Sequence, residues 1–81
     1  MIDPYAAVPR YIQLANILED EIRSRRLPAG RALPSEATLQ QRYGLARQTC
    51  RKAVAVLRDR GLAITVRGLG SFVVEKVPPR S

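Results

Sequence analysis

Histidine and tryptophan are absent from the 81 residues, and cysteine occurs only once, at Cys50. Without histidine the sequence lacks the commonest general base and metal ligand, and a lone cysteine excludes an internal disulfide. No apolar run is long enough to span a membrane, and the first residues lack the basic-then-apolar layout of a signal peptide. These absences favour a cytoplasmic protein with no metal and no cofactor.

The remaining candidates for catalysis are weak. Cys50 falls on an apolar helical stripe, where a buried cysteine behaves as a small hydrophobic residue. Glu19, Asp20 and Glu21 are consecutive, so they diverge around a helix, and we expect them on a solvated face as salt-bridge partners rather than as a catalytic pair. The glycine-rich stretch 68–70 is too short for a nucleotide-binding fingerprint. We therefore predict no catalytic residues and no enzyme.

Positive charge is abundant but unevenly placed. The net charge is +7, and residues 1–40 carry five basic and five acidic side chains, so the whole excess lies in residues 41–81. Such a one-sided distribution indicates a polyanionic partner more strongly than it indicates mere solubility. Nucleic acid is the partner that this pattern favours.

Helical periodicity accounts for the first half of the chain. Apolar residues recur on one face of a helix predicted over 9–26: Tyr11, Leu14, Ala15, Leu18 and Ile22. Pro9 suits its first turn, and Pro28 and Gly30 are expected to end it. A second helix is predicted over 36–43, with Ser35 as its N-cap and Gly44 as a left-handed C-terminal residue.

A third helix follows almost at once, over about 47–60. The three-residue connection 44–46 contains glycine, as the turn of a helix-turn-helix does. The predicted buried stripe of this helix is apolar and small: Cys50, Ala53, Val54 and Leu57. The basic side chains fall on its opposite side, so the helix presents a cationic face to solvent.

After Gly61 the apolar period changes from helical to alternating. Leu62, Ile64 and Val66 are predicted to face inward, and residues 68–70 form the tip of a hairpin. The return strand is predicted over 71–76, with Phe72 and Val74 on its inner face.

The order of elements predicts a mostly α fold with a small β-hairpin, a winged helix-turn-helix of three helices followed by a two-stranded wing. We expect a flexible arm over 1–8, the DNA-binding domain over 9–76, and a proline-rich tail or linker over 77–81.

Recognition helices place their N-terminal residues in the major groove. Here these are Arg47, Gln48 and Arg51, and arginine can pair with guanine O6 and N7 while glutamine pairs with adenine N6 and N7. The hydroxyls of Ser35 and Thr49 can add phosphate contacts. Arg67 leads the wing tip, whereas we interpret Arg58 and Arg60 as solvated surface residues.

The sequence resembles the GntR (gluconate-repressor-like) family of bacterial transcription regulators over roughly residues 9–74. The resemblance is carried by short segments in order: Pro9, Tyr11 and Gln13; 27–30; 33–36; Arg47, Thr49 and Arg51; 61–62; and 67–73. It implies a sequence-specific double-stranded-DNA binder that represses transcription by occupying an operator, and that pairs on an inverted repeat as a homodimer, at least on DNA. It adds no effector site within this short chain.

The resemblance also assigns residues. It implies base reading by Arg47 and Arg51. It implies wing contacts in or beside the minor groove by Arg67 and Gly68. We predict that the wing, residues 67–71, lies at the adjacent minor groove or backbone, with Leu69 and Gly70 also in contact with DNA. The predicted phosphate or sugar contacts are the following: Ser35, Glu36, Thr49 and Lys52. The sequence departs from the family pattern in three places, where polar or basic residues are usual: Ala37, Ala46 and Leu69.

Two alternatives stay open. A non-specific architectural or plasmid-maintenance DNA-binding protein would share the charge but would not need the glutamine and arginine base readers. A winged helix used for protein–protein contact would not need the net charge of +7 in residues 41–81. With DNA as the partner, the protein is expected in the cytoplasm, on the nucleoid, and not on a membrane.

Overall fold

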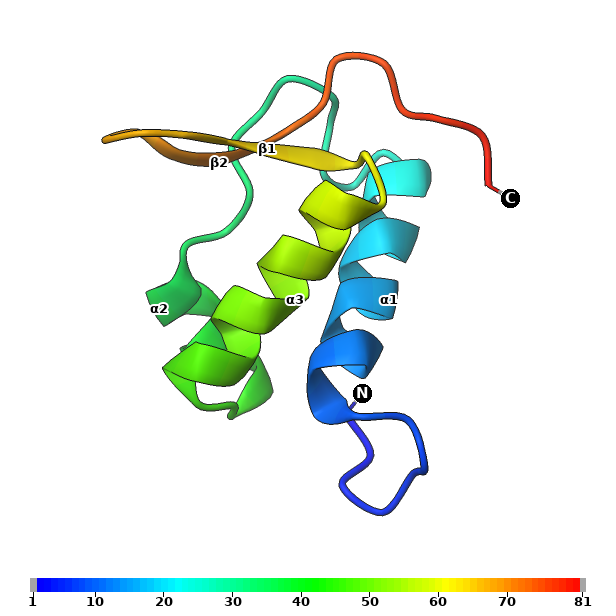
Figure 1. The fold of residues 1–81 in the computed structure, drawn as a ribbon, viewed down its shortest axis with the longest axis vertical. Helices are drawn as coiled ribbons and strands as arrows, with labels where there is room; N and C mark the ends of the chain where they lie inside the picture. The colour runs from blue at the N-terminus through cyan, green and yellow to red at the C-terminus, as the bar shows by residue number, and fades with distance from the viewer. Residues whose placement is uncertain (1, 81) are drawn as a thin grey trace.

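The computed structural model describes residues 2–80 and contains three helices followed by a two-stranded antiparallel sheet (Figure 1). The elements are α1 (Arg10–Arg23), α2 (Glu36–Tyr43), α3 (Arg47–Asp59), β1 (Ala63–Val66) and β2 (Gly70–Val73). This confirms the predicted winged helix-turn-helix. Met1 of the predicted arm and Ser81 of the predicted tail lie outside the described residues. Among those residues, no helix has the length and apolar character needed to cross a membrane.

Helix α1 packs its apolar face against α3 at the centre of the molecule. Four of the five predicted inward residues are buried, and the fifth, Tyr11, is half-buried. The helix ends at Arg23 rather than at residue 26, because Arg25 adopts a left-handed backbone with φ 68° and the Leu27 N–H donates to the Glu21 carbonyl. The end therefore comes from a left-handed turn before Pro28.

The helix-turn-helix forms as the sequence predicts. The Ser35 side chain accepts a hydrogen bond from the Thr38 N–H at the start of α2, and Gly44 ends α2 with φ 65°. Leu39 and Leu45 bury their side chains between α2 and the core. Ala46 opens α3 without a side-chain cap, which costs about 1 kcal/mol relative to a capping residue.

Helix α3 lies beside α1 (Figure 1) and buries the predicted stripe of Cys50, Ala53, Val54 and Leu57. Three of these side chains are fully buried, and Val54 is 7% exposed. The opposite side of α3 is exposed, so the basic side chains of this helix lie at the surface as predicted.

The wing faces differ from the sequence prediction. Leu62 is buried, but Ile64 is 51% exposed and Ala63 is buried in its place. The reason is that Leu62 lies in the connection after Gly61, so β1 begins one residue later and Ala63 pairs with Val73 over the core. On the return strand Val73 is the buried residue, not Phe72 or Val74, and β2 ends there.

A third backbone segment fastens the base of the wing. Ala32 forms an isolated antiparallel bridge with Phe72. The Leu33 N–H donates to the Ser71 carbonyl at 2.8 Å, and the Val73 N–H donates to the Arg31 carbonyl at 2.8 Å. Because residue 33 leads directly into α2, this pairing fixes the wing beside the start of the helix-turn-helix.

The predicted arm folds back on α1 through Gln13. Its side-chain amide donates to the carbonyls of Asp3 and Val8, each at 2.8 Å, and its Oε1 accepts from the Asp3 N–H at 2.7 Å. Ile2 packs against the core, while Tyr5 is 94% exposed. One polar side chain of α1 thus organises residues 3–8.

Candidate nucleic-acid interface

The N-terminal end of α3 and the tip of the hairpin lie on the same side of the molecule, the left-hand side of Figure 1. Arg47, Gln48 and Arg51 are all exposed there, and the side chains of Arg47 and Arg51 are 69% and 57% exposed. The three side chains that the sequence singled out as base readers are therefore accessible together, on one end of one helix.

Glu36, at the first turn of α2, joins the two arginines. Its Oε1 accepts from Arg47 Nε at 2.9 Å and its Oε2 accepts from Arg51 Nε at 3.4 Å. The hydrogen bond from Arg47, above all, lowers the pKa of the Glu36 carboxyl, so this group is ionised at neutral pH. Both contacts use Nε, so they leave the Nη groups of each arginine outside these two bonds.

This pairing adds a role that the sequence did not indicate. Glu36 was predicted only as a phosphate or sugar contact, and its partners stand 11 and 15 residues further along the chain. A carboxylate next to a phosphate would be repelled, whereas a carboxylate between two guanidinium groups holds both of them. The geometry thus makes Glu36 an anchor for Arg47 and Arg51.

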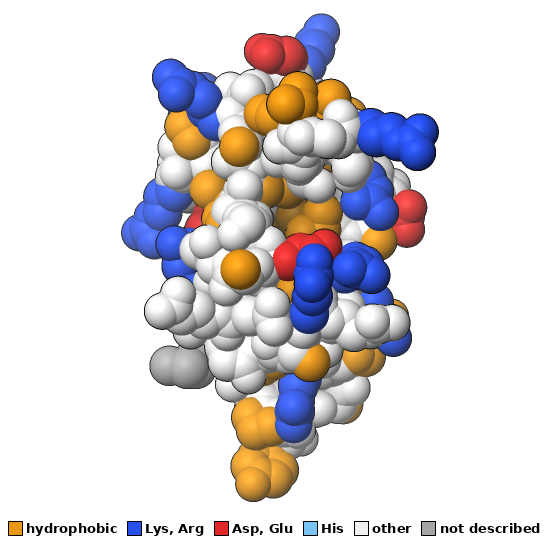
Figure 2. All heavy atoms as spheres, turned by 90° about the vertical axis from the view of Figure 1, so that its left-hand side faces the viewer, with side chains coloured by type: hydrophobic (Ala, Val, Ile, Leu, Met, Phe, Trp, Pro, Cys, Tyr) orange, Lys and Arg blue, Asp and Glu red, His pale blue; other side chains and the backbone are white. Residues whose placement is uncertain are grey.

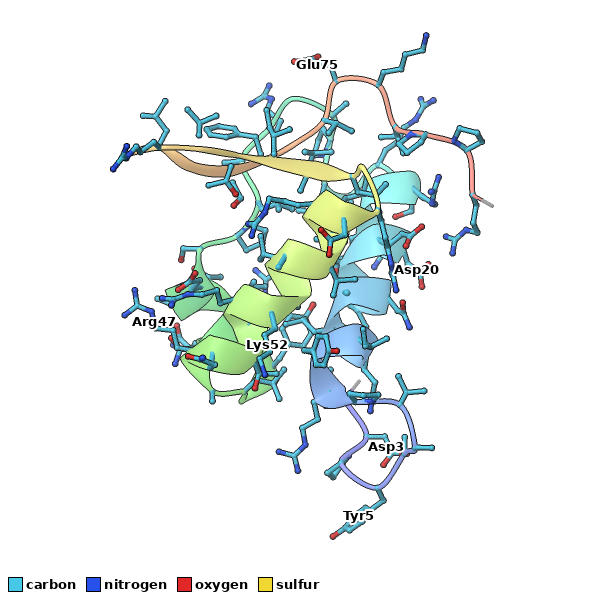
Figure 3. The ribbon with its side chains drawn as sticks, in the orientation of Figure 1. Asp3, Tyr5, Asp20, Arg47, Lys52 and Glu75 are labelled. Carbon is cyan, nitrogen blue, oxygen red and sulfur yellow. The ribbon has the colours of Figure 1, made fainter. Side chains whose placement is uncertain are left out.

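Of the residues predicted to contact DNA phosphate or sugar, Ser35 and Thr49 lie near this end of the molecule, and Lys52 points toward α1. The Ser35 hydroxyl also caps α2 and donates to Thr38 Oγ1 at 2.9 Å. Thr49 is half-buried on α3. Lys52 Nζ lies 5.8 Å from the centroid of the Tyr11 ring, on the side of α3 that faces α1 and away from Arg47 (Figure 3).

A cleft separates the wing from the two helices of the helix-turn-helix, and we call it the wing cleft. Its volume is about 640 Å³, and it is lined by the chain leading into α2, by the exposed side of α3 and by the inner side of the hairpin. Figure 2 shows this hollow, with basic side chains around an acidic one at its border. Arg47, Arg51 and Arg58 all line it, so its chemistry suits a polyanion.

The wing tip itself is open to solvent. Residues 67–69 form the loop, and Gly68 and Gly70 have φ of 81° and 108°, in the region that favours glycine. Arg67 is exposed, and Leu69 is 72% exposed. The four residues predicted as wing contacts therefore lie together at the tip, where Leu69 and Gly70 also line the wing cleft.

The candidates for other chemistry are structural. Cys50 is fully buried, and burial, helped by the charge of Glu36, raises the pKa of its thiol, which keeps it protonated. Across residues 2–80, no cluster of three or more cysteine and acidic side chains is arranged to hold a metal ion.

The arginines at the end of α3 are not simple solvated cations. Arg60 donates to Glu19 Oε1 at 2.8 Å and to Asn16 Oδ1 at 2.9 Å, and Arg58 donates to Thr65 Oγ1 at 2.9 Å. Glu19, predicted on a solvated face, is only 8% exposed. It is nevertheless a salt-bridge partner, as expected.

Comparison with known proteins agrees with this geometry. The family model of bacterial regulatory proteins, gntR family, matches residues 10–73. The HTH-type transcriptional regulator Rv0792c of Mycobacterium tuberculosis is 45% identical over 71 residues, which cover 88% of this chain and 26% of that protein. The mannosyl-D-glycerate transport/metabolism system repressor MngR of Escherichia coli is 34% identical, with 84% of this chain and 28% of that protein covered. The chain thus spans about a quarter of the length of these relatives.

Solved structures extend the likeness to the fold. The DNA-binding domain of AraR in complex with its operator ORX1 superposes with a TM-score of 0.82 at 30% identity, covering 91% of this chain and 92% of that one. A GntR family transcriptional regulator from Listeria monocytogenes gives a TM-score of 0.84 at 28% identity, covering 93% and 64%. The family consists of transcription regulators, not enzymes. The chain belongs to the gntR family of bacterial regulatory proteins and has the winged helix-turn-helix fold of that family's DNA-binding domains.

Proposed function

We propose that this chain recognises a specific double-stranded DNA sequence, with the N-terminal half of α3 in the major groove and the wing at the adjacent minor groove or backbone. The observation that carries the proposal is the pair of exposed arginines, Arg47 and Arg51, held together on one end of α3 by Glu36. Two guanidinium groups kept in a defined orientation suit base reading, because bidentate pairing with guanine depends on geometry as well as charge.

The other predicted contacts take roles around this pair. Gln48 would read adenine beside the arginines, and Ser35 and Thr49 would meet phosphates next to them. Lys52, on the side of α3 toward α1, would meet a phosphate further from this pair. Residues 67–70 would reach the neighbouring groove, where the glycines at 68 and 70 allow the backbone to approach closely. Leu69 offers no charge at the tip, so Arg67 would supply the electrostatic part of the wing contact.

We propose further that the protein represses transcription by occupying an operator. Relatives named as repressors, MngR and the HTH-type transcriptional repressor NagR of Bacillus subtilis, support this sign of regulation. Residues 9–76 would be the DNA-binding unit and 77–81 a linker, in a protein of the cytoplasm and nucleoid. Because one small module reads few base pairs, two copies would bind an inverted repeat, and we place no effector site within this chain.

Selection of bound sequences from a random DNA pool tests the proposal. An enriched inverted repeat, bound at least about 1,000-fold more tightly than unrelated DNA, is the expected outcome. A flat selection with no preferred sequence would favour instead a non-specific architectural or plasmid-maintenance protein. A single unrepeated element bound by one copy would remove the paired arrangement but keep the specific readout.

Replacing Arg67 with alanine should weaken binding to every DNA sequence alike. The wing arginine would neutralise one phosphate, so its loss should reduce the slope of log affinity against log salt by about one unit. Affinity for the selected operator and for unrelated DNA is measured across a salt series. Equal affinities of Arg67→Ala and the parent at every salt concentration would show that the wing does not touch DNA.

Glu36→Gln should have opposite effects on specific and non-specific binding. Loss of the carboxylate removes a negative charge from the DNA-binding face, so binding to unrelated DNA should become slightly tighter. The arginines lose their anchor, and the ratio of specific to non-specific affinity should fall by about fivefold, the cost of ordering one or two side chains. Both affinities are measured by titration with labelled duplexes.

Glu75→Gln is the matched control, because it makes the same change of charge on a part of the chain remote from Arg47 (Figure 3). It should leave the ratio unchanged. A ratio that falls equally in both variants would mean that Glu36 acts only through net charge and not as an anchor.

A further inference from the structure

We propose that Arg58 and Thr65 are positioning residues for the wing, which set the distance between the wing tip and α3. Arg58 was interpreted from the sequence as a solvated cation, and the comparisons assign neither residue a role. The inference rests on the proposed function, since it concerns how the wing is presented to DNA.

The observation is a series of three side chains across the wing cleft. Arg58, in the last turn of α3, donates through Nη1 to Thr65 Oγ1 at 2.9 Å, and Thr65 Oγ1 lies 3.1 Å from Ser71 Oγ. Thr65 and Ser71 are direct cross-strand partners in β1 and β2. Within residues 2–80, the Arg58–Thr65 bond is the one side-chain hydrogen bond from α3 to the hairpin, and it engages both strands through Thr65.

The position of this contact along the hairpin allows it to affect where the wing tip lies. Backbone pairing with residues 31–33 fastens β2 at Ser71 and Val73, which is the base of the wing on the side of α2. A two-stranded hairpin has little rigidity of its own. Thr65 lies opposite Ser71, the residue nearest the tip that the pairing with residues 31–33 reaches, and two residues before Arg67. The Arg58–Thr65 bond therefore holds the other strand, β1, toward α3 at the same level of the hairpin.

The competing interpretation is that Arg58 contacts a phosphate directly, because it lines the wing cleft. The two interpretations differ in what the Thr65 hydroxyl does. A phosphate contact by Arg58 does not need that hydroxyl, whereas a positioning role depends on it. The neutral partner of the pair, Thr65, is therefore the informative residue to change.

Thr65→Val and Thr65→Ser form a matched pair for the test. Valine keeps the branched shape and favours strands at least as well as threonine, but it lacks the hydroxyl; serine keeps the hydroxyl and is the weaker strand former. Each change is made in the parent and in the Arg67→Ala background, and affinity for the selected operator is measured. Thermal unfolding of each variant checks that the exposed substitution leaves the fold intact.

We expect Thr65→Val to weaken operator binding about three- to tenfold in the parent and less than twofold in the Arg67→Ala background, because a misplaced wing matters only while its arginine can reach DNA. Thr65→Ser should stay within about twofold of the parent. An equal loss in both backgrounds, or no loss with Thr65→Val, would overturn the proposal. A direct phosphate contact by Arg58 would also overturn it. In that case Arg58→Gln would lower the slope of log affinity against log salt by about one unit in both backgrounds, while Thr65→Val would leave operator affinity unchanged.

A measurement on the protein without DNA separates this inference from the proposed function. Backbone amide relaxation of Gly68 and Gly70 should show greater mobility in Thr65→Val than in the parent and in Thr65→Ser. If Arg67→Ala does not affect DNA binding, the proposed wing contact is wrong, yet this mobility still decides whether the tie holds the tip. If the backbone mobility of both glycines is unchanged in Thr65→Val, the Arg58–Thr65 contact does not hold the wing tip.

Discussion

Arg51→Lys is expected to keep most of the affinity for unrelated DNA and to lose the preference for guanine at one position in each half-site. Lysine retains the positive charge, but it cannot form the planar two-donor fork that pairs with guanine O6 and N7. A bidentate pair of this kind contributes about 1–3 kcal/mol of discrimination, so the preference should fall by roughly 5- to 150-fold. Binding to every single-base change in one half-site measures this directly.

Lys52→Ala is the control for charge alone. Lys52 lies one residue further round α3 and stands over the Tyr11 ring rather than beside Glu36. Its loss should weaken binding to all sequences alike and leave the guanine preference intact. If Arg51→Lys keeps the full preference while Lys52→Ala behaves as expected, Arg51 does not read a base and α3 acts mainly as a cationic support.

The contact with Glu36 gives this experiment a second arm. Arg51→Lys removes the hydrogen bond from Nε as well as the fork, so a loss of preference could begin at the anchor. Glu36→Gln removes the anchor but leaves the fork. Direct readout by Arg51 therefore predicts that the position-specific loss is large in Arg51→Lys and small in Glu36→Gln.

Local signals in the sequence were enough for the helix-turn-helix. Ser35 and Gly44 set the bounds of α2 because one side chain caps the first turn and the other residue tolerates a left-handed backbone. The end of α1 was placed too late, since nothing in the sequence marks Arg25 as left-handed. The wing faces were wrong because the pattern cannot show where pairing begins, and a shift of one residue exchanges the two faces of a strand.

Exposure of the arginines on α3 could likewise be predicted, but their partners could not. Periodicity places Arg47 and Arg51 opposite the buried stripe without any knowledge of the rest of the fold. Their pairing with Glu36 depends on how α2 packs against α3, and the pairing of Arg60 with Glu19 joins residues 41 positions apart. Such contacts are set by tertiary packing, so only the structure reveals them.

The Glu19 cluster has the largest expected effect on stability. Glu19 accepts from Arg23 Nε and from Arg60 Nη1, each at 2.8 Å, and its side chain is 10% exposed. Arg23 also donates to the Pro78 carbonyl at 2.7 Å. One buried carboxylate therefore connects α1 to the end of α3 and, through Arg23, to the chain that follows the wing.

Glu19→Gln should lower the free energy of unfolding at neutral pH by about 1–3 kcal/mol, because hydrogen bonds to charged groups are worth this much and the two hydrogen-bonded guanidinium groups, with that of Arg80 at 4.0 Å, would lose this counter-charge. For a domain of this size the melting temperature should fall by roughly 10 °C. Thermal unfolding followed by circular dichroism measures the shift. Asp20→Asn makes the same change of charge on the next residue, and it should stay within about 0.5 kcal/mol of the parent because, among residues 2–80, this exposed side chain pairs with Arg80 alone.

The contribution of Glu19 to the free energy of unfolding should depend on pH in a defined direction. Burial raises the pKa of Glu19, but the hydrogen bonds and charges of Arg23 and Arg60 outweigh burial, so the pKa in the folded protein lies below its ordinary value. A carboxyl with a lowered pKa stabilises the fold above its unfolded pKa, and this stabilisation is lost as the pH falls through the folded value.

The difference in melting temperature between the parent and Glu19→Gln should therefore be full at pH 7 and shrink steadily below about pH 4.5, near the unfolded pKa of a glutamate. Comparing the two proteins at each pH isolates Glu19 from Glu36, whose pKa is also lowered and which titrates in both. A difference that stays constant down to pH 3, or one that is absent at pH 7, would show that the ion pairs of Glu19 add nothing to the stability of the fold.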